Sequence, residues 1–124
     1  SPSLIAGLVD EGKEHTPLTP SNQRKEQVLS VETASTLGQI LLSAAQVGTG
    51  RPGAPEGVSV GIKTGTAQTG VQEGEEELLH FWYCGFVSGA GGPRYCITVL
   101  AESTPDDRGA AARVFRQVAA ALGA

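Results

Sequence analysis

The chain has 124 residues and a formal charge of −4, from 9 Lys and Arg against 13 Asp and Glu. This mild acidity argues against a nucleic-acid binder, which normally turns a basic face toward phosphates. Apolar residues make up 40% of the chain, enough for one small core. No run approaches the roughly 18 to 20 apolar residues of a membrane-spanning helix. The sequence therefore predicts one domain or part of one, with no nucleic-acid partner.

The first half of the chain predicts a short strand within residues 1–12, a solvated connection over 13–28 that pairs briefly as a second strand, and a helix over 30–47. Ser30 has the side chain of a helix N-cap, and we expect Gly48 to end the helix in a left-handed conformation. The apolar side chains of this helix follow helical spacing and should face a core: Leu37, Ile40, Leu41, Ala44 and Ala45.

The second half predicts a strand over 58–62 that leads into Lys63-Thr64-Gly65-Thr66-Ala67-Gln68, then an acidic, Gly-rich loop around 70–77. Residues 78–87 and 95–101 predict an antiparallel hairpin around a Gly-rich turn. Thr104 to Asp107 predict a turn and cap before a C-terminal helix. An antiparallel sheet with segregated helices is an α+β fold. The apolar stripe expected on the last helix is Ala111, Val114, Phe115, Val118, Ala119 and Leu122.

The run from Lys63 to Gln68 carries the chemistry. A Lys-Thr-Gly at the end of a strand is typical of serine acyl-transfer sites, together with Ser-x-x-Lys and a second serine motif. With His80-Phe81-Trp82-Tyr83-Cys84-Gly85-Phe86 and a closing helix downstream, this order resembles the C-terminal part of the transpeptidase domain of class B penicillin-binding proteins. The helix that opens with Glu32-Thr33-Ala34 and the turn Gly48-Thr49-Gly50 are similar to the family's approach to the same motif, so the resemblance covers nearly the whole chain.

The resemblance implies roles for five residues of this run. Lys63 would be catalytic, its positive charge helping to move a proton near the nucleophile. Thr66 would be catalytic through its backbone N–H, one half of an oxyanion hole, and its hydroxyl would join Thr64 in binding a substrate carboxylate. Gly65 would let an extended substrate backbone approach the strand, although a β-bulge is the alternative reason for a glycine there. Gln68 completes the expected substrate-binding set.

Two features depart from the family pattern. Ile62 stands where the family commonly has Gly, which predicts a bulky side chain beside the cleft strand. No serine of the chain begins a Ser-x-x-Lys, and no Ser-x-Asn occurs. Because acyl transfer needs a nucleophile and a base within hydrogen-bond reach, we expect residues 1–124 alone to be inactive. They would form the C-terminal part of a transpeptidase domain whose first part lies upstream or on another chain. Without that part, the 37–45 stripe and part of the sheet should expose apolar faces.

By resemblance, the parent protein cross-links peptidoglycan stem peptides ending in D-Ala-D-Ala through a serine acyl-enzyme, and β-lactams acylate it as mimics. No cofactor is implied. The family places such enzymes at the extracytoplasmic face of the bacterial membrane, held by an upstream anchor, and involves them in cell wall biogenesis and cell shape. Alternatives remain a D,D-carboxypeptidase or β-lactamase relative, and a non-catalytic β-lactam sensor or wall-binding module.

The remaining polar residues give weaker signals. His15 and His80 have no motif-like serine nearby, and the acidic run from Glu73 to Glu77 is better explained as a solvated loop than as a metal cage, so we expect no metal site. A hairpin turn centred near Ala90 would place Cys84 opposite Cys96. We expect two reduced, buried thiols, because directly paired strand positions fit disulfide geometry poorly.

Overall fold

The computed structural model describes residues 7–8, 16–17 and 26–123. The chain divides into two compact units, Ser1–Ser30 and Val31–Ala124. In the first unit, β1 (Gly7–Leu8) pairs with β2 (Thr16–Pro17) as a short antiparallel ladder. The brief second strand predicted in the connection is therefore present. The rest of the strand expected within 1–12 lies outside the described residues.

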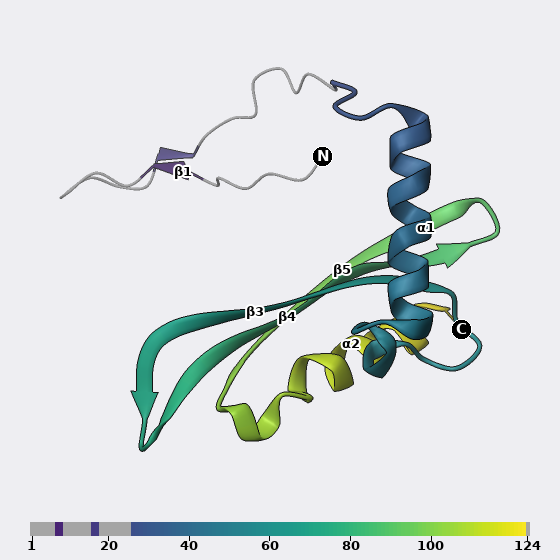
Figure 1. Ribbon diagram of the computed structural model, residues 1–124. Coiled ribbons are helices and arrows are strands. Elements are labelled where there is room, and N and C mark those ends of the chain that lie inside the picture. The colour runs from purple at the N-terminus through teal and green to yellow at the C-terminus, as the bar shows by residue number, and fades with distance from the viewer. Residues whose placement is uncertain (1–6, 9–15, 18–25, 124) are drawn as a thin grey trace. The chain divides into compact units, whose positions relative to one another are not determined.

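The second unit is a three-stranded antiparallel sheet with two helices (Figure 1). Its elements are α1 (Val31–Val47), a 3-10 turn η1 (Arg51–Gly53), β3 (Val60–Glu73), β4 (Glu76–Gly89), β5 (Gly92–Ser103), a second 3-10 turn η2 (Pro105–Asp107) and α2 (Ala110–Gly123). The strand order is β3-β4-β5, so each strand pairs with its neighbour in sequence. The predicted α+β class and the order of helix, strands and helix are confirmed.

The two helices pack on different parts of the sheet. α1 contacts β3 and crosses the sheet at the end where β3 begins, whereas α2 packs against β4 and β5 (Figure 1). Buried residues of both helices and of all three strands form one core. Its members are Ala45, Val60, Ile62, Phe81, Tyr83, Val87, Ile97, Ala111, Ala112, Phe115 and Ala119.

The helical stripes are only partly buried. On α1, Ala45 is buried, but Leu37 and Ile40 are 46% and 58% exposed, in accord with the expected lack of cover. On α2, Ala111, Phe115 and Ala119 are buried at a spacing of four residues, and Ala112 is buried beside them. The expectation that Val114 and Val118 face the core is wrong: they are 47% and 39% exposed. The buried face of α2 thus contains Ala112 in place of these two valines.

The end of α1 differs from the expected left-handed cap. Gly48 is not among the glycines with a positive φ. Instead, the backbone N–H groups of Gly48 and Gly50 both donate to the carbonyl of Ala44, at 3.1 and 3.2 Å. A Cβ at Gly48 would lie 3.0 Å from that same oxygen. Close backbone approach, rather than handedness, explains the glycine.

The predicted loop at 70–77 is mostly strand. β3 continues to Glu73 and β4 starts at Glu76, so the connection is a tight turn containing Gly74, whose φ is +67°. A β-bulge lies between Gln68 and Gln72, where Gly70 has a φ of +73°. The turn projects beyond both helices (Figure 1). The glycines mark the bulge and the turn, not an irregular loop.

The two cysteines are out of register with each other. The β4–β5 turn lies between Gly89 and Gly92, and the register shifts once more between Val87 and Ser88, so Cys84 lies opposite Thr98 and Cys96 lies opposite Phe86. Cys84 and Cys96 therefore do not pair directly, and both thiols are free. Cys84 is half-buried and Cys96 is exposed, so the expected burial of both is wrong.

Candidate functional site

β3 is an edge strand in the described part of the chain, because it pairs with β4 alone. An edge strand presents one row of unpaired backbone N–H and C=O groups to its surroundings. The segment from Lys63 to Gln68 lies within this strand, paired with residues Cys84 to Leu79 on its inner side. Its outer side can accept an extended chain as a further strand.

Strand alternation divides the motif between the two faces of the sheet. Thr64 and Thr66 are opposite Tyr83 and Phe81, which belong to the core face. Lys63 and Gly65 are opposite Cys84 and Trp82 on the other face. The predicted site residues are therefore adjacent in space, but they do not share one face. A substrate that lies along the edge of β3 can be reached from both faces.

A cavity of about 330 Å³ lies on the core face, beside the motif. Its walls combine polar groups and apolar side chains. The lining residues are Thr49, Thr64, Gly65, Thr66, Leu79, Phe81, Tyr83 and Arg108. The cavity brings together Thr64, Gly65 and Thr66 of the predicted set; Lys63 and Gln68 are not among its walls.

Thr64 is held by the turn that follows α1. The hydroxyl oxygens of Thr49 and Thr64 lie 2.9 Å apart, within hydrogen-bond distance. The Tyr83 hydroxyl donates to the backbone carbonyl of Thr49 at 3.1 Å. Burial raises the pKa of the Tyr83 hydroxyl above its ordinary value, so the neutral donor form is favoured. Hydrogen bonds thus link three residues that line the cavity: Tyr83 on β4, Thr49 in the turn after α1 and Thr64 on β3.

Lys63 is exposed, and its ammonium group donates to the backbone carbonyl of Thr64. The side chain is therefore folded back along the strand edge. Lysine is a flexible point charge, so it can exchange this carbonyl for another acceptor that comes close to the edge.

Gly65 has room for a side chain in the structure. A Cβ there would lie 3.6 Å from the Cβ of Trp82, which is an ordinary van der Waals contact. By contrast, a Cβ at Gly61 would lie 2.4 Å from the Phe86 ring, and one at Gly85 would lie 2.0 Å from the Gly61 carbonyl oxygen. The bulge alternative for Gly65 is wrong, since the irregularity of β3 lies beyond Gln68. Internal packing therefore explains the glycines at 61 and 85, but not the one at 65.

Ile62 does not lie beside the cleft, which corrects the expectation from its bulk. Its side chain is 0% exposed and belongs to the core. A Cβ at Gly50 would lie 2.8 Å from the Ile62 Cβ, and one at Gly53 would lie 3.5 Å from its Cδ1. Ile62 fills the space that these two glycines leave, so it anchors the turn after α1 against β3. The bulky side chain therefore packs beneath the turn after α1 and does not reach the cavity.

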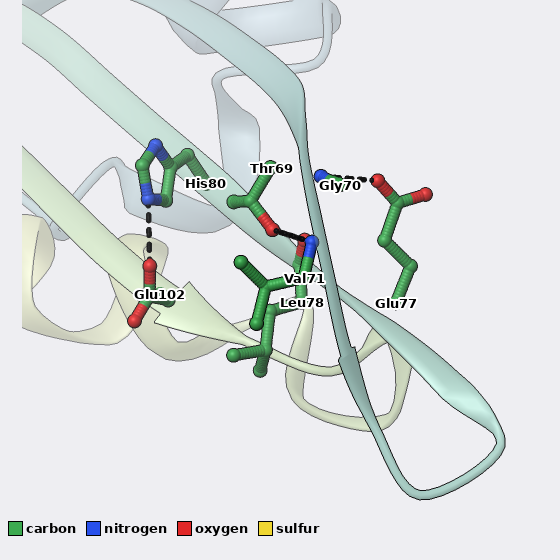
Figure 2. Close-up of polar contacts among 7 residues, drawn as sticks. All are labelled: Thr69, Gly70, Val71, Glu77, Leu78, His80 and Glu102. Carbon is green, nitrogen blue, oxygen red and sulfur yellow. Dashed lines mark hydrogen bonds and ion pairs between the residues drawn. The ribbon is translucent and has the colours of Figure 1, made fainter.

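Gln68 is engaged with the acidic arm of the hairpin. Its side-chain nitrogen donates to Glu77 Oε2 at 3.0 Å. The other oxygen of Glu77 accepts the Gly70 backbone N–H at 2.8 Å, and the Thr69 hydroxyl accepts the N–H of Val71 at 3.1 Å (Figure 2). Glu77 is thus a hydrogen-bond acceptor for the β-bulge rather than part of a solvated loop.

His80 pairs across the sheet with Glu102. Its Nε2 lies 2.8 Å from Glu102 Oε2 (Figure 2). Strand alternation places His80 on the face opposite Leu79 and Phe81, which line the cavity. No group of three or more potential metal-ligating side chains occurs within the described residues. His15 lies outside the residues that the structure describes. His80 is therefore a cross-strand partner that flanks the strand carrying the motif.

Sequence reasoning missed five lining residues of the cavity, the apolar Leu79 and Phe81 and the polar Thr49, Tyr83 and Arg108. Thr49 had a signal, because it stands between two glycines in a turn that precedes the motif strand. Tyr83 had a weaker signal, because strand alternation and pairing place it on the same face as Thr64. Arg108 had none, since only the tertiary structure brings the segment after β5 to the middle of β3.

Comparison with known proteins adds independent findings. A family described as penicillin binding protein transpeptidase domain matches residues 1–120. A curated relative, the peptidoglycan D,D-transpeptidase PbpA of Mycolicibacterium smegmatis, is 35% identical over 88 residues. The match covers 71% of this chain and 17% of the relative, so the chain spans a small part of the relative's length. The search of solved structures gave no significant match.

Proposed function

The chain belongs to the penicillin-binding protein transpeptidase domain family, and on that premise we propose that it forms the C-terminal part of a peptidoglycan D,D-transpeptidase domain. In this proposal its substrates are stem peptides ending in D-Ala-D-Ala, and β-lactams acylate the same site. It carries one wall of the active site on β3. The observation that supports this most strongly is that Lys63 to Thr66 lie on a strand whose outer edge has no partner among the described residues, beside a cavity lined by three threonines.

The proposed reaction proceeds through a serine acyl-enzyme. A serine hydroxyl attacks the carbonyl of the penultimate D-Ala, the terminal D-Ala leaves with a proton, and an amine of a second stem peptide then displaces the serine. Lys63 assists the transfer of the serine proton. The Thr66 backbone N–H stabilises the oxyanion of the tetrahedral intermediate, where preorganised donors contribute most.

The other motif residues bind the donor peptide. The peptide lies antiparallel or parallel to β3 as an added strand, with Gly65 permitting close backbone approach. The spare room at Gly65 supports this role, because packing within the chain does not call for a glycine there. The Thr64 and Thr66 hydroxyls donate to the terminal carboxylate, and Gln68 contacts the peptide farther along the strand.

The nucleophile comes from outside residues 1–124 in this proposal. None of the serines begins a Ser-x-x-Lys. The exposed apolar side chains Leu37 and Ile40 lie three residues apart on α1, and they support a cover that residues 1–124 do not supply. The rest of the domain, with the nucleophilic serine, its lysine and the Ser-x-Asn, would cover them. Residues 1–124 alone would then show no turnover.

We place the protein outside the cytoplasmic membrane, where peptidoglycan is cross-linked. No helix within the described ranges is both long and apolar enough to cross a membrane. An upstream segment would supply the anchor. Participation in cell shape follows only if this cross-linking activity is present.

The test is intact-mass spectrometry of the complete protein before and after incubation with benzylpenicillin. We expect a stable adduct of one drug mass on a serine. Rapid loss of the adduct by hydrolysis would favour a β-lactamase, and release of terminal D-Ala without cross-linking would favour a D,D-carboxypeptidase. The absence of any adduct would contradict the proposal and favour a non-catalytic wall-binding module. A stable adduct without cross-linking of peptides would favour a β-lactam sensor.

Lys63→Ala provides the matched test of mechanism. Loss of a general acid or base typically lowers a rate about 10²-fold or more, so acylation should slow by that order. Arg94→Ala is the control, because it removes one cation from the exposed end of the β4–β5 hairpin. Equal acylation of the Lys63 variant and the unsubstituted protein would remove Lys63 from the mechanism.

A further inference from the structure

Arg108 is the cation among the walls of the cavity beside the motif. It follows η2 and lies far along the chain from Thr64 and Thr66, which line the same space. Lys63, the motif's own cation, is on the opposite face of β3 and donates to the Thr64 carbonyl. The positive charge that faces the cavity therefore comes from Arg108, not from the lysine of the motif.

The side chain of Arg108 is oriented by its own turn. Its Nε donates to the backbone carbonyl of Pro105 at 3.1 Å. This bond uses one of the five N–H donors of the guanidinium and leaves the two terminal nitrogens available for a ligand. A guanidinium that is already fixed in direction loses less conformational entropy when it binds.

Nearby acids do not neutralise this charge within the described residues. The Asp107 carboxylate is bound by Arg113, whose Nη2 lies 2.8 Å from both carboxylate oxygens. Asp106 is exposed and is not among the walls of the cavity. The cavity thus joins a free guanidinium end to the hydroxyls of Thr64 and Thr66.

These groups together recognise a carboxylate on a small apolar body. A guanidinium binds a carboxylate through charge-assisted hydrogen bonds, and hydroxyl groups donate further ones. Leu79 and Phe81 supply an apolar wall suited to a short aliphatic side chain. The volume of about 330 Å³ lies at the lower end of the range usual for small-molecule pockets.

We propose that Arg108 is a specificity-determining residue of this site, which binds the carboxylate of the donor peptide or of a β-lactam against Thr64 and Thr66. This inference rests on the proposed function. Arg108 acts in the noncovalent complex, before the serine attacks. Its charge therefore contributes to affinity for anionic ligands and not to the rate of bond formation.

The experiment measures acylation of the complete protein by benzylpenicillin in a series of variants at position 108. We expect the apparent dissociation constant of the noncovalent complex to rise about tenfold in Arg108→Gln, because a charge-assisted hydrogen bond is lost. The first-order acylation constant should stay unchanged. Arg108→Lys should recover part of the affinity, and Arg108→Glu should bind more weakly than Arg108→Gln.

The Gln and Glu variants have nearly the same shape, so the difference between them reports charge. Arg116→Gln and Arg116→Glu form the control pair, because Arg116 is exposed on α2 and is not a wall of the cavity. They measure the effect of net charge alone. Thermal melts of all variants identify any that fail to fold. If Arg108→Gln or Arg108→Glu does not fold, the dissociation constants of Arg108→Lys and the unsubstituted protein are compared instead.

The outcomes separate this inference from the proposed function. An adduct in the unsubstituted protein with equal dissociation constants for Arg, Gln and Glu at 108 overturns the inference and leaves the transpeptidase proposal standing. A fall in the acylation constant with unchanged affinity also overturns it. No adduct in the unsubstituted protein overturns the proposed function, and this inference with it.

Discussion

The hydroxyl oxygens of Thr49 and Thr64 lie 2.9 Å apart, although the two residues are separated by 15 positions in the sequence. The contact joins the turn after α1 to the strand that carries the motif. Tyr83 holds the other side of the same turn through the Thr49 carbonyl. The orientation of the Thr64 hydroxyl is therefore set by residues outside the motif.

Thr49→Val should slow β-lactam acylation of the complete protein by about threefold to tenfold, because loss of one hydrogen bond costs roughly 1 kcal/mol and leaves the Thr64 hydroxyl free to turn away. Thr49→Ser keeps the hydroxyl and should acylate like the unsubstituted protein. Acylation rates and thermal melts are measured together. If Ser and Val variants slow equally, the hydroxyl contact has no part in the site.

Gly65→Ala and Gly61→Ala should separate function from packing. At Gly61 a Cβ would lie 2.4 Å from the Phe86 ring, so overpacking should destabilise the fold by about 1 to 3 kcal/mol. At Gly65 the added methyl meets only an ordinary contact with Trp82, so the free energy of unfolding should change by less than about 1 kcal/mol.

Gly65→Ala should lower the acylation rate even though it leaves the free energy of unfolding almost unchanged. Its methyl group would meet a substrate backbone at the strand edge, and the rate should fall by about tenfold or more. Urea unfolding and acylation kinetics on the complete protein give both quantities. A Gly65→Ala variant that acylates normally would show that the edge at this residue is not in contact with the ligand.

Tyr83→Phe should lower stability and alter its pH dependence. Loss of the hydrogen bond to Thr49 should cost about 0.5 to 1.5 kcal/mol near neutral pH. Burial raises the pKa of Tyr83 in the folded state, so the unfolded chain releases the proton first as the pH rises. The stabilising contribution is complete below the unfolded pKa of about 10 and is lost as the pH rises through the folded pKa.

Urea unfolding of the unsubstituted protein and of the Tyr83→Phe variant between about pH 8 and 11 measures this difference, since that range spans the ordinary tyrosine pKa. The gap in the free energy of unfolding between the two proteins should shrink as the pH increases through that range. A gap that is constant or that widens at high pH would contradict a raised pKa at this hydroxyl.

Glu77→Ala should loosen the β-bulge and Gln68. It removes the acceptor of the Gly70 N–H and of the Gln68 side chain at once. We expect amide hydrogen exchange at Gly70 to accelerate by about tenfold or more, with no change in the core strands, because the opening is local. Glu75→Ala is the control, since it removes the same charge from the hairpin turn. Equal acceleration in both variants would attribute the effect to charge alone.

Local periodicity was sufficient for much of the fold. The helical spacing around Ala45 predicted α1 to within one residue. The glycines predicted the two hairpins, but β3 and β4 extend farther into the 70–77 segment than expected. The motif from Lys63 to Gln68 was identified by the resemblance of this segment and its neighbours to a known family. Strand alternation would also have placed Ile62 on the face opposite to Lys63. Its burial there depends on the turn after α1, because Gly50 and Gly53 leave the space that its side chain fills.

The sequence by itself determined the class of the fold, the strand that carries the motif and the absence of a Ser-x-x-Lys. The tertiary structure alone decided that Arg108 and Thr49 reach the motif, and that the register of β4 and β5 places Cys84 opposite Thr98 rather than Cys96. The physical reason is the distance along the sequence over which the interactions act. Helical and strand periods are set by neighbouring residues, whereas bulges and contacts between distant segments depend on how whole elements pack.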